Sequence, residues 1–387
     1  MEWKEVRLGD VCTRVCSGGT PKSTNLSYYG GEIPWLNTKE IDFNRIYSTE
    51  KTITDSGLNN SSAKWIVPNT VTVAMYGATA GKSCIVKVPM TTNQACCNLT
   101  INDEVADYEF VYYSLKNDYT TLASLANGGA QQNLNAQIIK DYVLKMPSLA
   151  DQRRITSILS SLDRKIELNN KINADLEEMA QAIFKNWFVD FEPFKDGKFV
   201  DSELGMIPEG WKVGSLGDFC NVFTGKKNTN QAIEKGLYPF FSCAPEPLAS
   251  NDAIFNGKAI IIAGNGSYTG RTSFYNGGFD LYQRTYACTI REQDKENLMI
   301  FFYHMMKQFF EPVKMGGTRG SSIPYIVMGD ITQQKFPYSE EWLIRFSNIV
   351  NSMMDRKLRI DKENSRLSLL RDTLLPRLMS GELEVPE

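Results

Sequence analysis

The chain opens on a sequence that it repeats 208 positions later. Trp3-Lys4 leads into Leu8-Gly9-Asp10-Val11-Cys12, and Trp211-Lys212 leads into Leu216-Gly217-Asp218-Phe219-Cys220 at the same internal spacing. A repeat that is kept in order along one polypeptide predicts two similar halves on a common scaffold. Pseudo-symmetric proteins of this kind tend to bind ligands that also have two halves.

Other landmarks of the repeat follow in the same order in both halves. They are Gly81 with Gln94 and Gly270 with Gln283, Gly128-Gly129 and Gly316-Gly317, Pro147 and Pro337, and Asp163-Arg164-Lys165-Ile166 and Asp355-Arg356-Lys357-Leu358. The offset between the copies falls from 208 to about 190 along the chain, so the copies differ by insertions in loops. Sequence identity between the landmarks is low, which predicts a shared scaffold whose loops carry different side chains.

The composition is that of a globular protein long enough for two hydrophobic cores. The chain has 387 residues, of which 42% are hydrophobic and 22% are charged. Its formal net charge of −3 argues against a protein that coats nucleic acid on its own, because such proteins carry a basic excess. A local basic stripe, or phosphate contacts made by partner subunits, is compatible with this charge. No apolar run reaches the ~18 residues of a membrane helix, and the N-terminus does not resemble a signal peptide, so we expect a cytoplasmic protein.

The residue types that usually carry catalysis or bind metals are sparse. Eight cysteines form no Cys-x-x-Cys pair and His304 is the only histidine, so we expect no metal site and no catalytic residue. His304 lies in an apolar helical stretch, which favours a packed position over a general base. The cysteines are expected to be reduced and mostly buried.

One motif suggests an enzyme. The stretch Gly77-Ala-Thr-Ala-Gly81-Lys82-Ser83 resembles a phosphate-binding P-loop but has three residues between its glycines, where the motif needs four. The matching stretch of the second half, Gly266-Ser-Tyr-Thr-Gly270-Arg271-Thr272, has arginine in place of the lysine. A glycine-rich turn between strands tolerates that exchange, so we expect a turn. A nucleotide-binding hydrolase that uses residues 77–83 is kept as an alternative.

Each half divides into a globular part and a helical part. The globular parts, residues 1–148 and 196–339, contain short β-type runs bounded by Gly and Asn, which predicts mixed α/β folds. Residues 149–195 and 340–387 are predicted to hold one long helix each, and the second helix is expected to stop or kink at Pro376. We therefore predict an α+β protein, in which two pseudo-symmetric mixed α/β domains are joined by two long helices packed as an antiparallel coiled coil.

Apolar residues recur on both helical segments at alternating steps of four and three, the spacing of a coiled-coil seam. Asn169 and Asn173 interrupt the seam at positions where a buried amide can fix the register. An antiparallel pair would separate the two globular domains like a ruler; alternatively, each helix packs on its own domain as a core helix. The predicted seam comprises Ile155, Leu159, Leu162, Ile166, Leu176, Ile183, Ile360, Leu367 and Leu374.

Polar loops supported by glycine recur at matching positions in both halves. Asn, Gln, Arg and Lys side chains contact base edges, and Ser and Thr hydroxyls bond to phosphates. Because the side chains differ between the copies, the loops predict two DNA-reading domains with different specificities. The candidate DNA-binding residues are Thr20, Lys22, Lys82, Gln94, Gln131, Gln132 and Asn133 in the first half and Lys226, Lys227, Tyr268, Arg271, Arg284, Thr318 and Arg319 in the second.

Several segments are typical of one protein family. They are Gly30-Gly31-Glu32-Ile33-Pro34-Trp35-Leu36, Pro147-Ser-Leu-Ala-Asp-Gln152-Arg153-Arg154-Ile155, the segment from Phe184 to Pro193, and Leu204-Gly205-Met206-Ile207-Pro208-Glu209-Gly210-Trp211. On these residues, the chain resembles the DNA-specificity subunit of type I restriction-modification systems over essentially its whole length.

This resemblance implies a non-catalytic subunit with two target recognition domains, each of which reads one half of a split site in double-stranded DNA. It implies that the helices set the gap and dock two adenine methyltransferase subunits, with Gln152 and Arg153 at the docking position, and that restriction motor subunits join them. S-adenosylmethionine, ATP and magnesium then belong to these partners. The second helix has Tyr338-Ser-Glu-Glu-Trp342-Leu343-Ile344 where the first has the Gln152-Arg153 signature, so the two ends are expected to dock partners unequally. A coiled-coil assembly scaffold without base reading is a further alternative.

Overall fold

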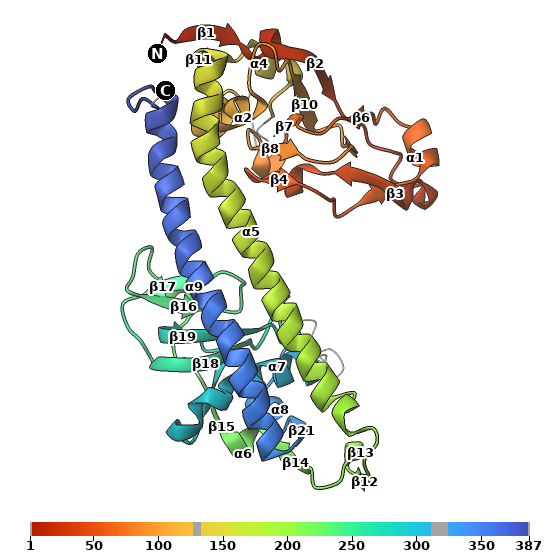
Figure 1. Cartoon of the computed structure of the whole chain (residues 1–387), viewed down its shortest axis with the longest axis vertical. Helices are drawn as coiled ribbons and strands as arrows, with labels where there is room; N and C mark the ends of the chain where they lie inside the picture. Colours follow the sequence, from red (N-terminus) through yellow and green to blue (C-terminus); the bar gives the residue numbers. More distant parts are fainter. Residues whose placement is uncertain (1, 127–132, 311–323, 386–387) are drawn as a thin grey trace. The chain divides into compact units, whose positions relative to one another are not determined.

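The computed structural model describes residues 2–126, 133–310 and 324–385, and its contacts divide the chain into two compact units (Figure 1). Unit 1 contains Met1–Leu168 and Glu363–Glu387, and unit 2 contains Asn169–Lys362. The two boundaries fall within the long helices α5 (Leu149–Phe188) and α9 (Glu340–Met379), which have 40 residues each. Each unit therefore holds one globular domain together with part of both helices.

Unit 1 is built on a five-stranded sheet with the strand order β2-β10-β7-β8-β4. The strands of a second, four-stranded sheet, in the order β5-β3-β9-β6, alternate along the chain with those of the first sheet, and β1 pairs antiparallel with β11. The strands are β1 (Lys4–Arg7), β2 (Cys12–Ser17), β3 (Tyr29–Leu36), β4 (Arg45–Ile46), β5 (Thr52–Ile53), β6 (Trp65–Ile66), β7 (Val71–Ala74), β8 (Ser83–Val86), β9 (Met90–Thr92), β10 (Cys96–Ile101) and β11 (Val143–Met146). The helices are α1 (Asp55–Asn59), α2 (Tyr108–Asn117), α3 (Tyr119–Ser124) and α4 (Ala136–Asp141).

Unit 2 is built on a six-stranded sheet with the order β15-β20-β18-β19-β16-β17. Two antiparallel pairs, β12–β13 and β14–β21, accompany it. The strands are β12 (Phe199–Ser202), β13 (Gly205–Pro208), β14 (Lys212–Ser215), β15 (Cys220–Thr224), β16 (Tyr238–Phe241), β17 (Leu248–Ser250), β18 (Phe255–Ala263), β19 (Thr272–Leu281), β20 (Thr285–Ile290) and β21 (Lys335–Tyr338). The helices are α6 (Leu216–Phe219), α7 (Met299–Phe309) and α8 (Met328–Thr332).

The two units share one scaffold, as the repeat predicts. The strands β2-β10-β7-β8 of unit 1 have the same order and chain connections as β15-β20-β18-β19 of unit 2. In both, the strand just before the central sheet, β1 or β14, pairs antiparallel with the strand that precedes a long helix, β11 or β21. The segment between β2 and β7 is longer than the segment between β15 and β18, and this difference accounts for the falling offset of the repeat.

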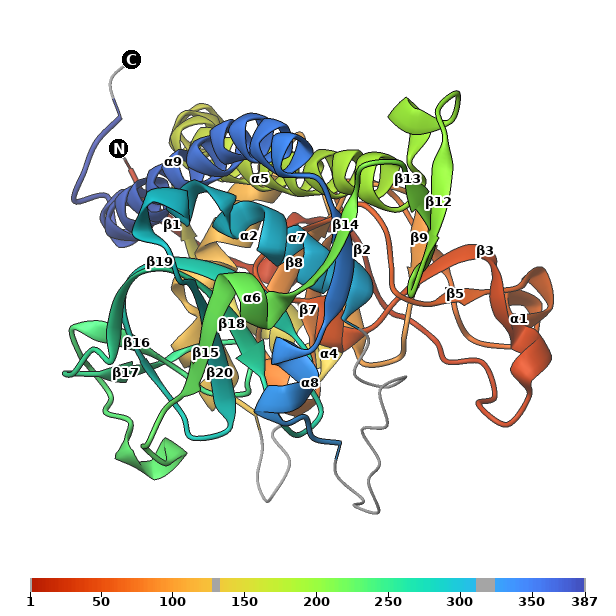
Figure 2. The same ribbon diagram turned by 90° about the horizontal axis from the view of Figure 1, so that it is seen from below.

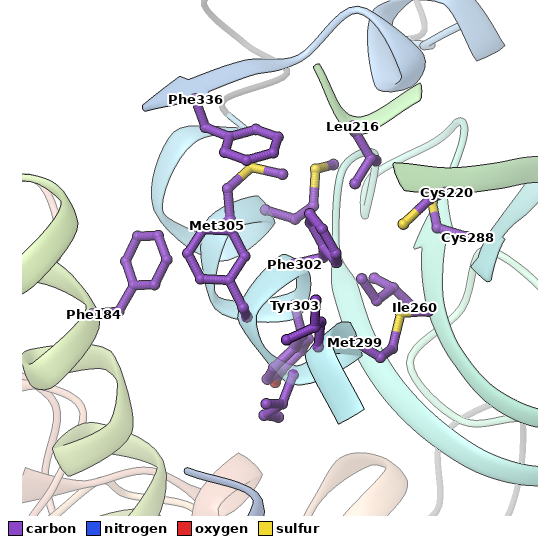
Figure 3. Packing of buried hydrophobic residues seen from close by; sticks show 14 of the residues in the cluster. Phe184, Leu216, Cys220, Ile260, Cys288, Met299, Phe302, Tyr303, Met305 and Phe336 are labelled. Atoms are coloured by element: carbon purple, nitrogen blue, oxygen red, sulfur yellow. The ribbon is translucent and has the colours of Figure 1, made fainter. Parts of the chain in front are cut away.

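The core of unit 2 forms around α7, which lies between the sheet and the long helices (Figure 2). Phe274 of β19 contacts Tyr303 on one side of α7, and Phe184 of α5 packs on Phe301 on the other, with ring centroids 5.4 Å apart. Figure 3 shows Phe184, Phe336 of β21 and Leu216 of α6 around the apolar side chains of α7. Because α7 is apolar on nearly every face, it can be stable only when it is enclosed in this way.

The core of unit 1 joins its globular domain to both long helices. Ile155 and Leu159 of α5 and Leu378 of α9 are buried in one cluster with Phe110 of α2 and Leu144 of β11. The start of α5 thus packs both on its own globular domain and on α9. Unit 1 therefore combines the two predicted arrangements, the paired helices and the helix that packs on its own domain. α2 begins where the Asp107 carboxylate accepts a hydrogen bond from the Phe110 N–H at 2.9 Å, an N-cap.

In each unit the two long helices run antiparallel. In unit 1, Lys165 of α5 pairs with Glu363 of α9 and Asp163 pairs with Arg371, so positions fall along α5 as they rise along α9. In unit 2, the Asn173 amide donates to Asp361 at 2.7 Å, while Lys357 pairs with Glu177 at 3.0 Å. Figure 1 shows the yellow start of α5 beside the blue end of α9 in unit 1.

The predicted fold class, two mixed α/β domains with two long antiparallel helices, is confirmed. Of the two outcomes predicted at Pro376, a stop or a kink, the stop is wrong. α9 does not stop at Pro376 but continues to Met379. A proline lacks only its own N–H, so the one backbone hydrogen bond lost is the one that residue 376 would donate, and the residues after it keep their donors. The next turn still forms, since the Pro376 carbonyl accepts from the Ser380 N–H at 3.0 Å.

His304 makes the stability of unit 2 dependent on pH. It is fully buried in α7, and its Nδ1 lies 2.9 Å from Gln181 Oε1. Burial lowers the pKa of His304 from 6.5 to about 4. The charge of Glu177 opposes this shift, and the charges of Lys307 and Lys357 add to it. A lowered histidine pKa stabilises the fold above pH 6.5, and that stabilisation is lost as the pH falls towards the folded value. We expect unit 2 to lose about 2 kcal/mol between pH 7 and pH 5.

Denaturant unfolding at both pH values measures this loss, with His304→Gln as the comparison. Because the chain has no other histidine, the variant should lack most of the pH dependence in this range. If the free energy of unfolding falls equally between pH 7 and pH 5 in the wild type and the variant, His304 is not the source of the pH dependence.

Candidate nucleic-acid interface

Loops from distant parts of unit 1 meet where the β7–β8 hairpin turns. The Met75 N–H donates to Ala95 at 2.8 Å, the Gly19 N–H donates to Thr92 at 2.9 Å, and the Thr79 hydroxyl donates to the Thr38 carbonyl at 3.0 Å. We call this surface the loop face of unit 1. It comprises residues 18–22, 37–42, 76–82, 93–95 and 133.

The corresponding loops of unit 2 meet in the same way. The Gly264 N–H donates to Arg284 at 2.9 Å, the Thr224 hydroxyl donates to the Gln283 carbonyl at 2.7 Å, and Cys243 lies 3.0 Å from Asn265. Asn265 forms a β-bridge with Tyr325, as Tyr76 does with Asn133 in unit 1. The loop face of unit 2 comprises residues 225–228, 242–246, 265–271, 282–284 and 324–325.

The glycine-rich stretch of unit 1 is a β-hairpin and not a P-loop. It connects β7 to the antiparallel strand β8 through one short 3-10 turn at Gly77–Thr79, whereas a P-loop leads into an α-helix. The Gly81 N–H donates to the Ala74 carbonyl at 2.8 Å, and the Ala74 N–H donates to Lys82 at 2.9 Å. Gly77 and Gly81 have φ values of +77° and +84°, which only glycine adopts readily. The alternative of a nucleotide-binding hydrolase at residues 77–83 therefore loses its structural basis.

The hairpin of unit 2 repeats this geometry bond for bond. The Gly270 N–H donates to Ala263 at 2.8 Å and the Ala263 N–H donates to Arg271 at 3.0 Å, while Gly270 has a φ of +84°. Arg271 therefore occupies the position of Lys82. Tyr268 takes the place of Thr79 and is 49% exposed, so the same backbone presents different side chains in the two units.

The hairpin cations do not stand free. Lys82 Nζ lies 2.6 Å from the carboxylate of Asp42, and the Arg271 guanidinium donates to the Ala244 carbonyl at 2.6 Å. Asp42 lies in the segment between β2 and β7, and Ala244 lies in the corresponding segment between β15 and β18. These contacts orient the cations, and they could not be seen in the sequence because the partners are 40 and 27 positions away.

Lys227 is held more strongly than the other predicted contact residues. Its ammonium lies 2.7 Å from Asp252 and 2.6 Å from the buried Asp280, and hydrogen bonds to these carboxylates raise its pKa. Lys227 therefore stabilises its loop, with its charge balanced by two carboxylates. Of the other predicted contacts, Thr20, Lys22, Gln94, Asn133, Lys226 and Arg284 are exposed. Gln131, Gln132, Thr318 and Arg319 lie outside the described residues.

The structure adds residues that the sequence did not single out. Tyr76 is 41% exposed beside Asn133, and Asn37 receives a hydrogen bond from the Asn93 amide at 3.2 Å. Asn93, rather than its neighbour Gln94, shapes the turn, because its side-chain amide oxygen accepts a hydrogen bond from the Ala95 N–H at 3.0 Å. Neither Tyr76 nor Asn37 stands in a motif, so no sequence signal marked them.

The two residues of the predicted docking signature, Gln152 and Arg153, have different surroundings at the start of α5. Gln152 is buried and its amide is used internally, accepting from the Asp107 N–H at 2.9 Å and donating to the Pro147 carbonyl at 3.0 Å. Arg153 is exposed and lines a polar groove with Asp103 and Tyr108. A partner at this position would therefore meet Arg153, while Gln152 joins the helix to its domain.

The start of α9 has a different character. A groove lies between its first turn and the segment before α7, and Leu298, Leu343 and Ile344 line it together with Lys295 and Glu340. Ile344 is 48% exposed. The chemical difference between the helix starts, expected from their sequences, is thus present on the surface.

Metal sites and membrane helices are not seen in the parts of the chain that the structure describes. No group of three or more His, Cys, Asp or Glu side chains is placed to hold a metal ion there. No helix of the described residues is long and apolar enough to cross a membrane. All eight cysteines are free thiols, and burial raises the pKa of Cys97 and Cys220 to about 12, which keeps these thiols protonated.

Two domains with one scaffold, matching loop faces of different chemistry and two long helices define a duplicated DNA-recognition protein. The chain belongs to the family of the type I restriction modification DNA specificity domain, whose sequence profile it matches over residues 1–178 and 208–339. The predicted family is thereby confirmed, and the chain is a type I restriction-modification specificity subunit with two such domains.

Relatives of this chain carry the same description. It is 28% identical over 412 aligned positions to the type I restriction enzyme MjaIX specificity subunit of Methanocaldococcus jannaschii, covering 100% of this chain and 94% of the relative. It is 34% identical over 187 positions to the EcoDI specificity subunit of Escherichia coli, covering 46% of this chain and 40% of that protein. These relatives are named as specificity subunits, in agreement with the prediction that catalysis belongs to other subunits.

The fold has a close counterpart among solved structures. The type I restriction-modification system S subunit from M. genitalium superposes with a TM-score of 0.63 at 18% identity, covering 100% of this chain and 97% of that chain.

Proposed function

We propose that each unit reads one half of a bipartite target in double-stranded DNA through its loop face. The observation that carries this proposal is the pair of hairpins with the same backbone hydrogen bonds and different side chains. A shared backbone places both hairpins alike against a duplex, and different side chains specify different bases. Arg284 and Lys226 in unit 2, and Lys22 in unit 1, are exposed cations suited to phosphate contacts.

The long helices would set the gap between the half-sites. α5 and α9 each pass from one unit to the other without a break, and the Asn173–Asp361 bond fixes their register. Buried amides of this kind specify one register at some cost in stability. The gap in the DNA target would follow from the number of helical residues between the units.

The helix starts would dock two adenine methyltransferase subunits, and restriction motor subunits would join that complex. Arg153 at the start of α5 and Ile344 at the start of α9 offer different contacts, so we expect the two methyltransferase copies to bind with unequal affinity. S-adenosylmethionine, ATP and magnesium would act in those partners.

The test is a map of methylated adenines in cells that express the chain with its methyltransferase subunit. We expect two short half-sites separated by a fixed gap. Four residues inserted after Asn170, with four more after Glu363 to keep the helices paired, should lengthen the gap by about two base pairs, because each residue adds 1.5 Å of helix. Neither half-site should change.

The control is the exchange of exposed Lys171 for alanine, which alters the same helix without changing its length. A continuous target in the wild type would contradict the two-domain reading. A gap unchanged by the insertion would contradict the spacer role. Complexes that methylate without sequence preference would favour the scaffold alternative.

A further inference from the structure

We propose that Asp42 and Lys82 act together as one specificity-determining element that reads a cytosine–guanine base pair in the half-site of unit 1. The proposal rests on the proposed function of the loop faces and names the base pair that one of them recognises. Its elements are a carboxylate and an ammonium 2.6 Å apart, on two loops that are joined at the loop face.

The position of Asp42 is fixed by its loop. The Asp42 N–H donates to the Asn44 side chain at 3.0 Å, and the Thr79 hydroxyl ties Thr38, earlier in the same loop, to the hairpin. The next residue, Phe43, has a φ of +51°, a conformation that is strained for a bulky side chain. Its carbonyl accepts from the Tyr112 hydroxyl at 2.5 Å, so the α2 helix holds the strained residue in place.

Both side chains remain accessible to a ligand. The Asp42 side chain is 66% exposed and the Lys82 side chain is 26% exposed. The network that follows, in which buried Arg45 binds Glu109 and Glu167, anchors the other end of the loop to α2 and α5. Asp42 is therefore an exposed group on a rigid support, and rigid support is what base discrimination requires.

A carboxylate on this surface is informative because DNA phosphates repel it. Next to Lys82, Asp42 cancels the charge that a phosphate contact would use, so the pair is poorly suited to bind the DNA backbone. It is suited to the major groove, where a carboxylate accepts from cytosine N4 and a lysine donates to guanine O6 and N7. In a cytosine–guanine pair the N4 amino group and the O6 acceptor are neighbours in the major groove. The Asp42 carboxylate and the Lys82 ammonium, which are also neighbours, can therefore bind both bases of one pair.

The adenine–thymine pair fits this element less well. It also places an amino donor beside a carbonyl acceptor, but the thymine O4 has the apolar methyl group as its neighbour. Only guanine offers the ammonium two adjacent acceptors. The orientation of Lys82 by Asp42 therefore favours the cytosine–guanine pair.

Unit 2 supports the interpretation by contrast. Arg271, at the position equivalent to Lys82, is held by the backbone carbonyl of Ala244 instead of a carboxylate. The carbonyl orients Arg271 without neutralising its charge and offers no side-chain acceptor beside it. The equivalent hairpin positions should then read different base pairs, as a target with two unlike half-sites needs.

The test compares adenine methylation by the assembled complex with its methyltransferase subunits. The wild-type map gives both half-sites, and purified complexes then methylate duplexes altered at one base pair. Asp42→Ala should reduce discrimination against other base pairs about 5- to 150-fold at one cytosine–guanine position of one half-site. Lys82→Met should relax the same position. The gap and the other half-site should stay as in the wild type.

Glu382→Gln is the matched control, because Glu382 is an exposed carboxylate of unit 1 that pairs with Arg377 at 2.9 Å away from the loop face. It should leave every position unchanged. The thermal unfolding midpoint of each variant separates specificity from stability.

Three results would overturn the proposal. They are a wild-type half-site without a fixed cytosine–guanine position, an Asp42→Ala complex with unchanged discrimination, and the relaxation of different positions by the two variants. Each leaves the split target intact. A wild-type complex without sequence preference would instead refute the proposed function itself.

Discussion

Asp163→Ala is expected to destabilise unit 1 by about 3–5 kcal/mol, because it breaks a buried ionic network. Asp163 accepts hydrogen bonds from Tyr113 of α2 at 2.6 Å and from Arg371 of α9 at 2.9 Å, and it lies 3.6 Å from Arg45. The Arg45 side chain is 3% exposed, so its guanidinium cannot recover the lost interaction from water. Glu109 and Glu167 remain, but they do not bind Arg371.

Denaturant unfolding measures this loss, and hydrogen exchange assigns it to the amides of unit 1. Asp372→Ala is the matched control. Asp372 binds the same Arg371 at 2.8 Å but is 56% exposed, so its removal should change the free energy of unfolding by less than about 1 kcal/mol. Equal effects of the two substitutions would show that burial does not set the strength of this network.

Phe184→Ala should destabilise unit 2 to a similar extent, about 3–5 kcal/mol, through a cavity in its core. Phe184 is fully buried and lies with its ring centroid 5.1 Å from Phe188, 5.4 Å from Phe301 and 5.6 Å from Phe346. These rings belong to α5, α7 and α9, so one side chain joins three helices. Little rearrangement can fill the space, because the neighbouring rings are held by further contacts of their own.

The free energy of unfolding of Phe184→Ala is best compared with that of Met179→Ala. Met179 is on the same helix and is 52% exposed, so its truncation should cost less than about 0.5 kcal/mol. Phe184→Leu should fall between them. A small effect of Phe184→Ala would mean that the three helices are held together by other residues.

The repeat in the sequence predicted the scaffold because it marks backbone requirements. Gly81 and Gly270 recur because each needs a positive φ in the same hairpin, and the predicted turn is confirmed at both. The long helices were predictable from their apolar spacing. Of the predicted seam, Ile155, Leu159 and Ile360 are buried, whereas Leu162, Ile166, Leu176, Ile183, Leu367 and Leu374 are half-buried.

The sites were less predictable because their chemistry depends on partners far away in the chain. Lys82 and Lys227 were equal candidates in the sequence, yet Lys227 is bound by two carboxylates and Lys82 by one. Gln152 belongs to a recognisable signature, but its amide is hydrogen-bonded to the backbone of Asp107 and Pro147 within unit 1. Side-chain pairing of this kind depends on the tertiary fold, so the spacing of neighbouring residues in the sequence does not predict it.

The make-up of unit 1 has a consequence for synthesis of the protein on the ribosome. Its core cluster combines Phe110 and Ile155 with Leu375, Leu378 and Met379, and Gly381 lies against Trp3. Unit 2 is complete once residue 362 has left the ribosome, whereas the N-terminal domain must wait for the last 25 residues of the chain. Nascent domains usually fold in the order of translation. Here the domain that is made first is finished after unit 2, and a truncation of the chain before residue 363 would remove part of the core of the N-terminal domain.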